Sequence, residues 1–106
     1  MVFVETSLFS KLLGDYLSED EYRDLQNHLV ADPEAGALIR GSGGVRKVRW
    51  RAGGKGKSGG IRVIYYWAKR DEQVFLLTLY GKGERQDLSA ADLRRVLKLL
   101  AEITNG

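Results

Sequence analysis

The stretch IRVIYYW at residues 61–67, followed by KRDEQ at 69–73 and VFLLTLY at 74–80, decides the fold. The first and last segments are rich in β-branched and aromatic residues, which favour strands. The first is apolar on both faces apart from Arg62, as expected for a strand in the interior of a sheet. Because the polar link is short, we expect the two strands to be central, adjacent and antiparallel.

The residues before these strands also alternate in a strand pattern, over 46–51. Successive side chains of a strand point to opposite faces, so Val48 and Trp50 share one face with Arg46. The opposite face carries three cations, which are Lys47, Arg49 and Arg51. We therefore expect this strand to expose a row of cations.

A glycine-rich loop at 52–60 joins that strand to the next and adds Lys55 and Lys57. Its GKGKSG segment matches the GxGxxG pattern of dinucleotide-binding folds, but there the pattern opens a helix that holds the pyrophosphate. Here a strand follows, so no nucleotide cofactor is expected. The two lysines can still contact phosphate groups.

Helical periodicity predicts three helices. Apolar residues recur at helical spacing over 8–16. Ser18 and Glu21 form a capping box that starts a second helix, and Asp32-Pro33 ends it. A third apolar stripe runs over 93–103.

With a first short strand at Val2-Phe3-Val4, the order of elements is β-α-α-β-β-β-α. This order predicts a small α+β fold in which two N-terminal helices and a C-terminal helix pack on an antiparallel sheet. No repeat or linker divides the sequence, so we expect residues 1–106 to form a single domain.

The composition excludes several classes of protein. The chain has 106 residues, 43% of them hydrophobic, no cysteine and one histidine, His28. Disulfide frameworks, thiolate nucleophiles and paired-histidine metal sites are therefore not expected, and we expect no metal or other cofactor. No apolar run approaches the roughly 18 residues of a membrane span, and the N-terminus does not resemble a signal peptide. A soluble cytoplasmic protein is expected.

The charges are strongly divided along the chain. Residues 1–39 carry a balance of −6 and residues 71–106 a balance of −1, whereas residues 40–70 contain ten basic side chains and no acid. Such a segment is either a solvated face that aids solubility or a binding surface for a polyanion. The tryptophans and tyrosines interleaved with the cations favour a nucleic acid as the partner.

Three segments resemble the HigB-type toxins of the RelE superfamily: GGVRKVRW (43–50), GGIRVIYYW (59–67) and LLTLYGKGERQDLS (76–89). The opening residues 3–26 share the resemblance, which thus covers nearly the whole chain. It implies a RelE-like α+β fold and an endoribonuclease that cuts messenger RNA in the ribosomal A site. It also implies partners, namely the ribosome, messenger RNA and a HigA-like antitoxin with a helix-turn-helix.

The resemblance also implies roles for individual residues. The strand cations Lys47 and Arg49, with Arg51 next to them, would bind RNA, together with the loop lysines. The arginine that opens the next strand is Arg62, and the lysine after the last strand is Lys82. Each of these two has a plainer interpretation, as a strand-end arginine and as a solvated turn lysine.

Two positions depart from the family pattern. Where RelE has an arginine after that lysine and a tyrosine in the following turn, this sequence has Gly83 and Ser89. The identity of the general base is therefore open. Tyr80, beside Lys82, either supplies a phenol or belongs to the core.

RNA can be cut without a metal when its own 2′-OH attacks the phosphorus. The reaction needs a base, an acid for the leaving 5′-oxygen, and cations for the charge on the phosphate oxygens. Lysine, arginine and tyrosine can supply all three. The catalytic candidates are thus Arg62, Lys82 and Tyr80, and the alternative is a catalytically weak homologue that only binds RNA or its antitoxin.

Overall fold

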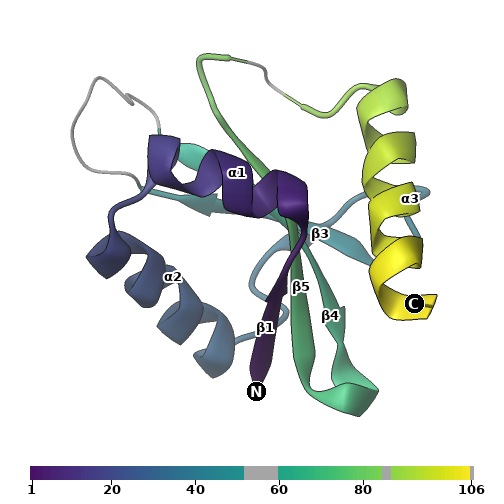
Figure 1. Cartoon of the computed structure of the whole chain (residues 1–106), viewed down its shortest axis with the longest axis horizontal. Coiled ribbons are helices and arrows are strands. Elements are labelled where there is room, and N and C mark those ends of the chain that lie inside the picture. Colours follow the sequence, from purple (N-terminus) through teal and green to yellow (C-terminus); the bar gives the residue numbers. More distant parts are fainter. Residues whose placement is uncertain (52–59, 85–86, 106) are drawn as a thin grey trace.

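The computed structural model describes residues 1–51, 60–84 and 87–105. Figure 1 shows how the helices and strands of these residues are arranged. In chain order they are β1 (Val2–Glu5), α1 (Ser7–Tyr16), α2 (Glu19–Ala31), β2 (Ala37–Leu38), β3 (Val45–Trp50), β4 (Ile61–Ala68), the short 3-10 helix η1 (Lys69–Asp71), β5 (Gln73–Gly81) and α3 (Ala90–Asn105). The α+β class predicted from the sequence is confirmed.

The strands form one sheet in the order β1-β5-β4-β3-β2. The two apolar strands β4 and β5 are central and antiparallel, as predicted, and β2 to β5 all pair antiparallel with their neighbours. The prediction of a purely antiparallel sheet is wrong, because β1 pairs parallel with β5. Short links force antiparallel pairing only between consecutive strands, and two helices and three strands separate β1 from β5.

The edge strand β2 is an element that the sequence pattern did not predict. It has two residues, paired with Lys47 and Arg46 of β3, inside a segment expected to be only a turn-rich connection. Two residues are too few for periodicity to show.

The N-terminal helices begin where the sequence indicates. Thr6 caps α1: its hydroxyl accepts from the Phe9 N–H at 3.0 Å and donates to the Leu77 carbonyl of β5 at 2.8 Å. Ser18 and Glu21 make both hydrogen bonds of the predicted capping box at the start of α2. The Thr6 hydrogen bond to β5 ties the start of α1 to the sheet, and the capping box sets the first turn of α2.

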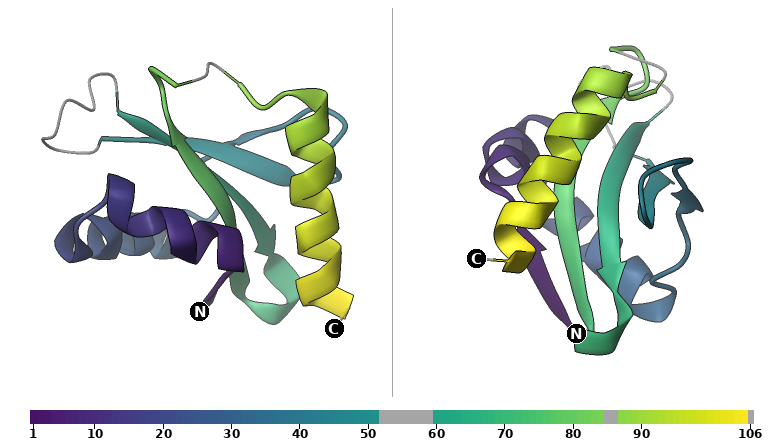
Figure 2. Two further views of the ribbon diagram at one scale, coloured as in Figure 1. Left: turned by 45° about the horizontal axis from the view of Figure 1, so that its top comes forward. Right: turned by 90° about the vertical axis from the view of Figure 1, so that its right-hand side faces the viewer.

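The sheet separates two hydrophobic cores. On one side, α1 and α2 contribute Phe9, Leu25 and Leu29 to a core that includes Val63 of β4. On the other side, α3 contributes Val96 and packs on the second core, which includes Ile64 of β4. Figure 2 shows the single helix and the helix pair on different sides of the strands.

The described part of the chain has no helix that is both long and apolar enough to cross a membrane.

Candidate active site

Three of the predicted site residues lie in one row across the sheet. Arg49 of β3 pairs with Arg62 of β4, and Arg62 pairs in turn with Tyr80 of β5. Directly opposed residues point to the same face, with their Cβ atoms about 5 Å apart. We call this set of three residues the Arg49–Arg62–Tyr80 row. It lies on the face of the sheet that α3 covers farther along.

The row runs from the surface into the interior. Arg49 is exposed, Arg62 is 8% exposed and Tyr80 is 3% exposed. The Arg62 guanidinium donates from Nη1 to the Ile61 carbonyl at 3.3 Å. Burial, the two neighbouring side chains of the row and this hydrogen bond restrict the Arg62 guanidinium. A fixed donor of this kind can stabilise charge that develops on a phosphate.

The next row on the same face of the sheet contains Lys47, which pairs with Ile64 of β4. Its ammonium forms an ion pair with the Asp87 carboxylate, which reaches it from the segment before α3. The Lys47 side chain is 24% exposed, so the prediction that the whole strand face is exposed is wrong for this residue. The partner is 40 residues away in sequence.

Lys82 lies in the turn that follows β5 and is exposed. Its N–H donates to the Gly60 carbonyl at 3.2 Å, which extends the contact between the two strands beyond Gly81. The turn is closed by Glu84, whose N–H donates to the Gly81 carbonyl at 3.0 Å and whose Oε1 accepts from the Gly81 N–H at 2.8 Å. The backbone that carries Lys82 is therefore well anchored.

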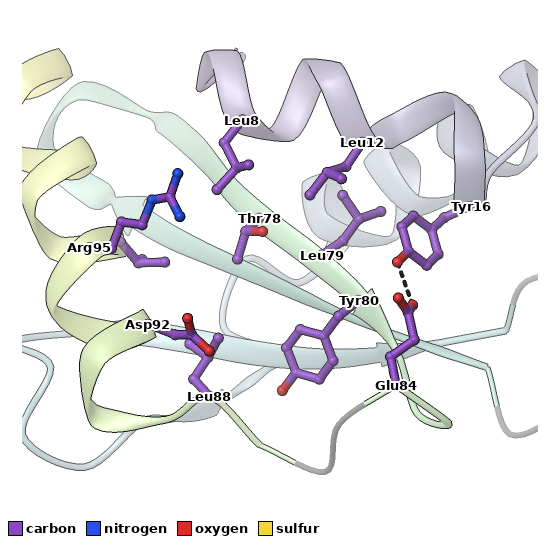
Figure 3. A pocket seen from close by; sticks show the side chains of 11 residues that line it. Leu8, Leu12, Tyr16, Thr78, Leu79, Tyr80, Glu84, Leu88, Asp92 and Arg95 are labelled. Carbon is purple, nitrogen blue, oxygen red and sulfur yellow. Dashed lines mark hydrogen bonds between the residues drawn. The ribbon is translucent and has the colours of Figure 1, made fainter.

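Tyr16, at the C-terminal end of α1, also donates to the Glu84 carboxylate, as Figure 3 shows. The first helix thus reaches the turn that carries Lys82. Sequence analysis missed the part played by Glu84. The sequence signal for it is weak, namely a carboxylate three residues after the glycine that ends β5.

Tyr80 lines two pockets on either side of the segment around Leu88. One, of about 200 Å³, lies between α1, β5 and α3, with Leu8 and Arg95 among its walls (Figure 3). The other, of about 410 Å³, is lined by Lys47 and Asp87 among others. The ring packs in the second core and also lines both pockets. That its phenol takes part in proton transfer stays a prediction.

The structure describes one of the three remaining predicted RNA-binding residues. Arg51 follows β3 directly and is exposed. Lys55 and Lys57 lie outside the described residues. The loop they belong to leads into β4, a strand rather than a helix, which agrees with the prediction that GxGxxG here is not a nucleotide-binding turn.

His28 was not expected to take part in the site. It is exposed near the end of α2, and its ring centroid lies 5.1 Å from that of Trp50. Trp50 packs on the α1–α2 core, so this pair is on the face opposite the Arg49–Arg62–Tyr80 row. The described geometry gives His28 no contact with that row.

Comparison with known proteins gives two findings. A family model described as the RelE toxin of the RelE/RelB toxin–antitoxin system matches residues 29–105. Among solved structures, a mutant of the E. coli toxin RelE in the free state is similar, with a TM-score of 0.56 and 20% sequence identity over 80% of this chain and 86% of that chain. The second finding shows that the fold is that of RelE. The first shows that the chain belongs to the RelE toxin family of toxin–antitoxin systems.

Proposed function

We propose that this protein is a HigB-type toxin that enters the ribosomal A site and cuts the messenger RNA there without a metal ion. It acts in the cytoplasm as a single domain and arrests translation and growth. The observation that carries the proposal is the Arg49–Arg62–Tyr80 row, which places a fixed cation and a phenol next to an exposed cation.

Each member of the site has a task that suits its position. Arg62 stabilises the charge on the phosphate oxygens in the transition state, since its guanidinium can donate two parallel hydrogen bonds. Lys82 and Tyr80 supply the groups for proton transfer with the 2′-OH and the leaving 5′-oxygen. The neighbouring cations hold the RNA backbone: Lys47, Arg49, Arg51, Lys55 and Lys57.

A second candidate function is supported by the burial of the same residues. Arg62 and Tyr80 are only 8% and 3% exposed, which limits the access of a substrate to both. Gly83 and Ser89 also stand where RelE has an arginine and a tyrosine. These features favour a catalytically weak homologue that binds RNA or its antitoxin without cutting.

Mapping of messenger RNA ends after induced expression separates the two candidates. The nuclease produces new ends within translated codons, and these ends disappear with Arg62→Ala. Arg70→Ala is the matched control, because Arg70 is an exposed arginine in η1, at the other end of β4. Growth arrest by the wild type without new ends would favour the binding module instead.

The cognate partner is a HigA-like antitoxin. The cationic segment attracts an acidic partner segment, and complementary charge mainly raises the rate of association. The alternative is docking of a basic partner on the N-terminal helices, since residues 1–39 carry a balance of −6.

Association rates with charge-reversed variants decide between these two surfaces. Reversal of Lys47 and Arg49 slows association if the cationic face is used. For the helices, Glu19 and Asp24 are the residues to reverse, since Glu21 accepts the Ser18 N–H at 2.9 Å in the capping box and its loss would disturb α2. If only the reversal on α2 slows binding, the antitoxin does not use the cationic face.

A further inference from the structure

The Lys47–Asp87 ion pair brings an acid onto a segment whose own sequence contains none. Lys47 is on the same face as the Arg49–Arg62–Tyr80 row, two residues before Arg49. Its ammonium can hold a phosphate beside the row. In the free protein this position is occupied by the Asp87 carboxylate.

The two partners differ in how firmly they are held. Lys47 is fixed in a paired strand and its side chain is 24% exposed, whereas the Asp87 side chain is 73% exposed. The next residue, Leu88, packs on the second core and lines the pocket of about 410 Å³ that Lys47 and Tyr80 also line. The carboxylate therefore stands in solvent at the mouth of that pocket, on a backbone fixed by its neighbour.

The other ion pair of this strand has a different character. The Arg46 guanidinium pairs with the Glu34 carboxylate at 3.2 Å and also donates to the Gly36 carbonyl at 2.7 Å and the Glu34 carbonyl at 3.2 Å. These bonds to the backbone hold the segment before β2 in place. No contact described for Asp87 plays such a structural part, so Asp87 can leave Lys47 without disturbing β3.

We infer that the Asp87 carboxylate is an internal substitute for an RNA phosphate, which keeps Lys47 neutralised in the free toxin and is displaced when RNA binds. This inference rests on the proposed function, since it assumes that the face binds RNA. A carboxylate and a phosphodiester each offer an ammonium one negative charge and oxygen acceptors. The Asp87 side chain is 73% exposed, so RNA can reach the carboxylate and a phosphate can take its place beside Lys47. Asp87 thus lowers the affinity of this face for any RNA. Only an RNA that makes further contacts with the protein or the ribosome then binds firmly.

Binding of a short single-stranded RNA, followed by fluorescence anisotropy on the full-length protein, tests the inference. Asp87→Asn keeps the size of the side chain and removes its charge, so the affinity should rise about two- to fivefold at about 0.1 M salt. Asp24→Asn is the matched control, because it removes the same charge from an exposed position on α2, which packs on the opposite face. In a Lys47→Gln background, Asp87→Asn should change the affinity no more than the control does.

Four outcomes would overturn the inference, and they are distinguishable. A lower affinity for Asp87→Asn would show that the carboxylate positions Lys47 or contacts the RNA itself. An equal gain in the Lys47→Gln background would show a general charge effect. A wild type that binds no RNA would contradict the proposed function together with this inference, whereas a wild type that binds RNA and is unaffected by Asp87→Asn contradicts the inference alone.

Discussion

Arg62 is a cation that the sheet keeps almost entirely out of water. A buried charge is an exception among core positions, most of which are apolar. The sequence indicates this exception, because Arg62 is the only charged residue in an otherwise apolar strand segment. The register then shows what the sequence could not, namely that Arg49 and Tyr80 are its neighbours.

Lys47 shows the limit of sequence reasoning at this scale. The alternation of β3 correctly placed it on the face shared with Arg49, because side chains alternate in any strand. Its ion pair with Asp87 depends on how the segment before α3 returns to the sheet. No local pattern encodes that return, so the exposure of Lys47 was overestimated.

A pair of polar residues on the other side of the sheet predicts how the stability of the protein depends on pH. The Tyr22 hydroxyl donates to Glu5 Oε2 at 2.6 Å. Burial, and then the hydrogen bond and negative charge of Glu5, raise the pKa of Tyr22 well above its ordinary value. In the unfolded chain this phenol ionises near pH 10, while in the folded protein it keeps its proton. The unfolded state therefore binds fewer protons at high pH, and stability falls as the pH rises above about 10.

Urea denaturation at pH 8 and pH 11 measures this effect. The wild type should lose stability between the two pH values, and Tyr22→Phe should lose less. The free energy of unfolding should fall with pH more steeply in the wild type than in Tyr22→Phe, by up to about 1.4 kcal/mol per pH unit for one proton. Tyr65 has a pKa raised in the same direction by burial, so the variant should keep part of the dependence. Identical slopes for the two proteins would refute the role assigned to Tyr22.

At the scale of elements, the helices were easier to predict than the edges of the sheet. The second helix was predicted at both ends, because a capping box and a proline act within a few residues. The direction of β1 and the existence of β2 were missed. The direction of β1 depends on pairing with β5, which is far away in the chain, and β2 has only two residues, so periodicity shows neither.

Gly60 shows a local requirement of the connection between β3 and β4. Its φ is +76°, a region that favours glycine, and a Cβ placed there would lie 2.5 Å from the Trp50 carbonyl oxygen. Gly60 also accepts the Lys82 N–H, so its backbone contributes to the anchoring of the Lys82 turn. Backbone strain at Gly60 would therefore also displace the turn that carries Lys82.

Gly60→Ala is expected to destabilise the protein by about 1–3 kcal/mol, from backbone strain and the close contact. Denaturant unfolding measures the change. Gly14→Ala is the control, since Gly14 is within α1 and an added Cβ would meet nothing within 4 Å. It should stabilise the protein by about 0.5–1 kcal/mol through helix propensity. A Gly60→Ala protein as stable as the wild type would contradict this account of the turn.

At the scale of the whole molecule, folding places acidic side chains next to some of the cations that the sequence shows without a neighbouring acid. The ten cations of residues 40–70 have no acid among them in sequence. In the structure Glu34 pairs with Arg46 and Asp87 pairs with Lys47. The sequence therefore indicated the correct sign of the surface but not how much of its charge is compensated within the protein.

Ribosome association measured against salt concentration tests whether the cationic face of β3 binds ribosomal or messenger RNA. Reversal of Lys47 and Arg49 to glutamate should weaken association and flatten its salt dependence, by about 0.7–0.9 in slope for each RNA phosphate that the variant no longer neutralises. The control reverses Lys69 and Arg70, the same residue types in η1 at the other end of β4. If the two double variants weaken association equally, the ribosome responds only to net charge.

The central claim is that Arg62 stabilises the transition state of messenger RNA cleavage. Single-turnover cleavage of messenger RNA on ribosomes with an open A site measures this directly. Arg62→Ala should lower the rate constant about 100- to 1,000-fold, because one preorganised donor contributes about that much. Arg62→Lys should restore only part of the loss, since an ammonium cannot donate the paired hydrogen bonds of a guanidinium. Circular dichroism checks that both variants are folded, and Arg70→Ala should cut at the wild-type rate. A folded Arg62→Ala protein that also cuts at the wild-type rate would contradict the account.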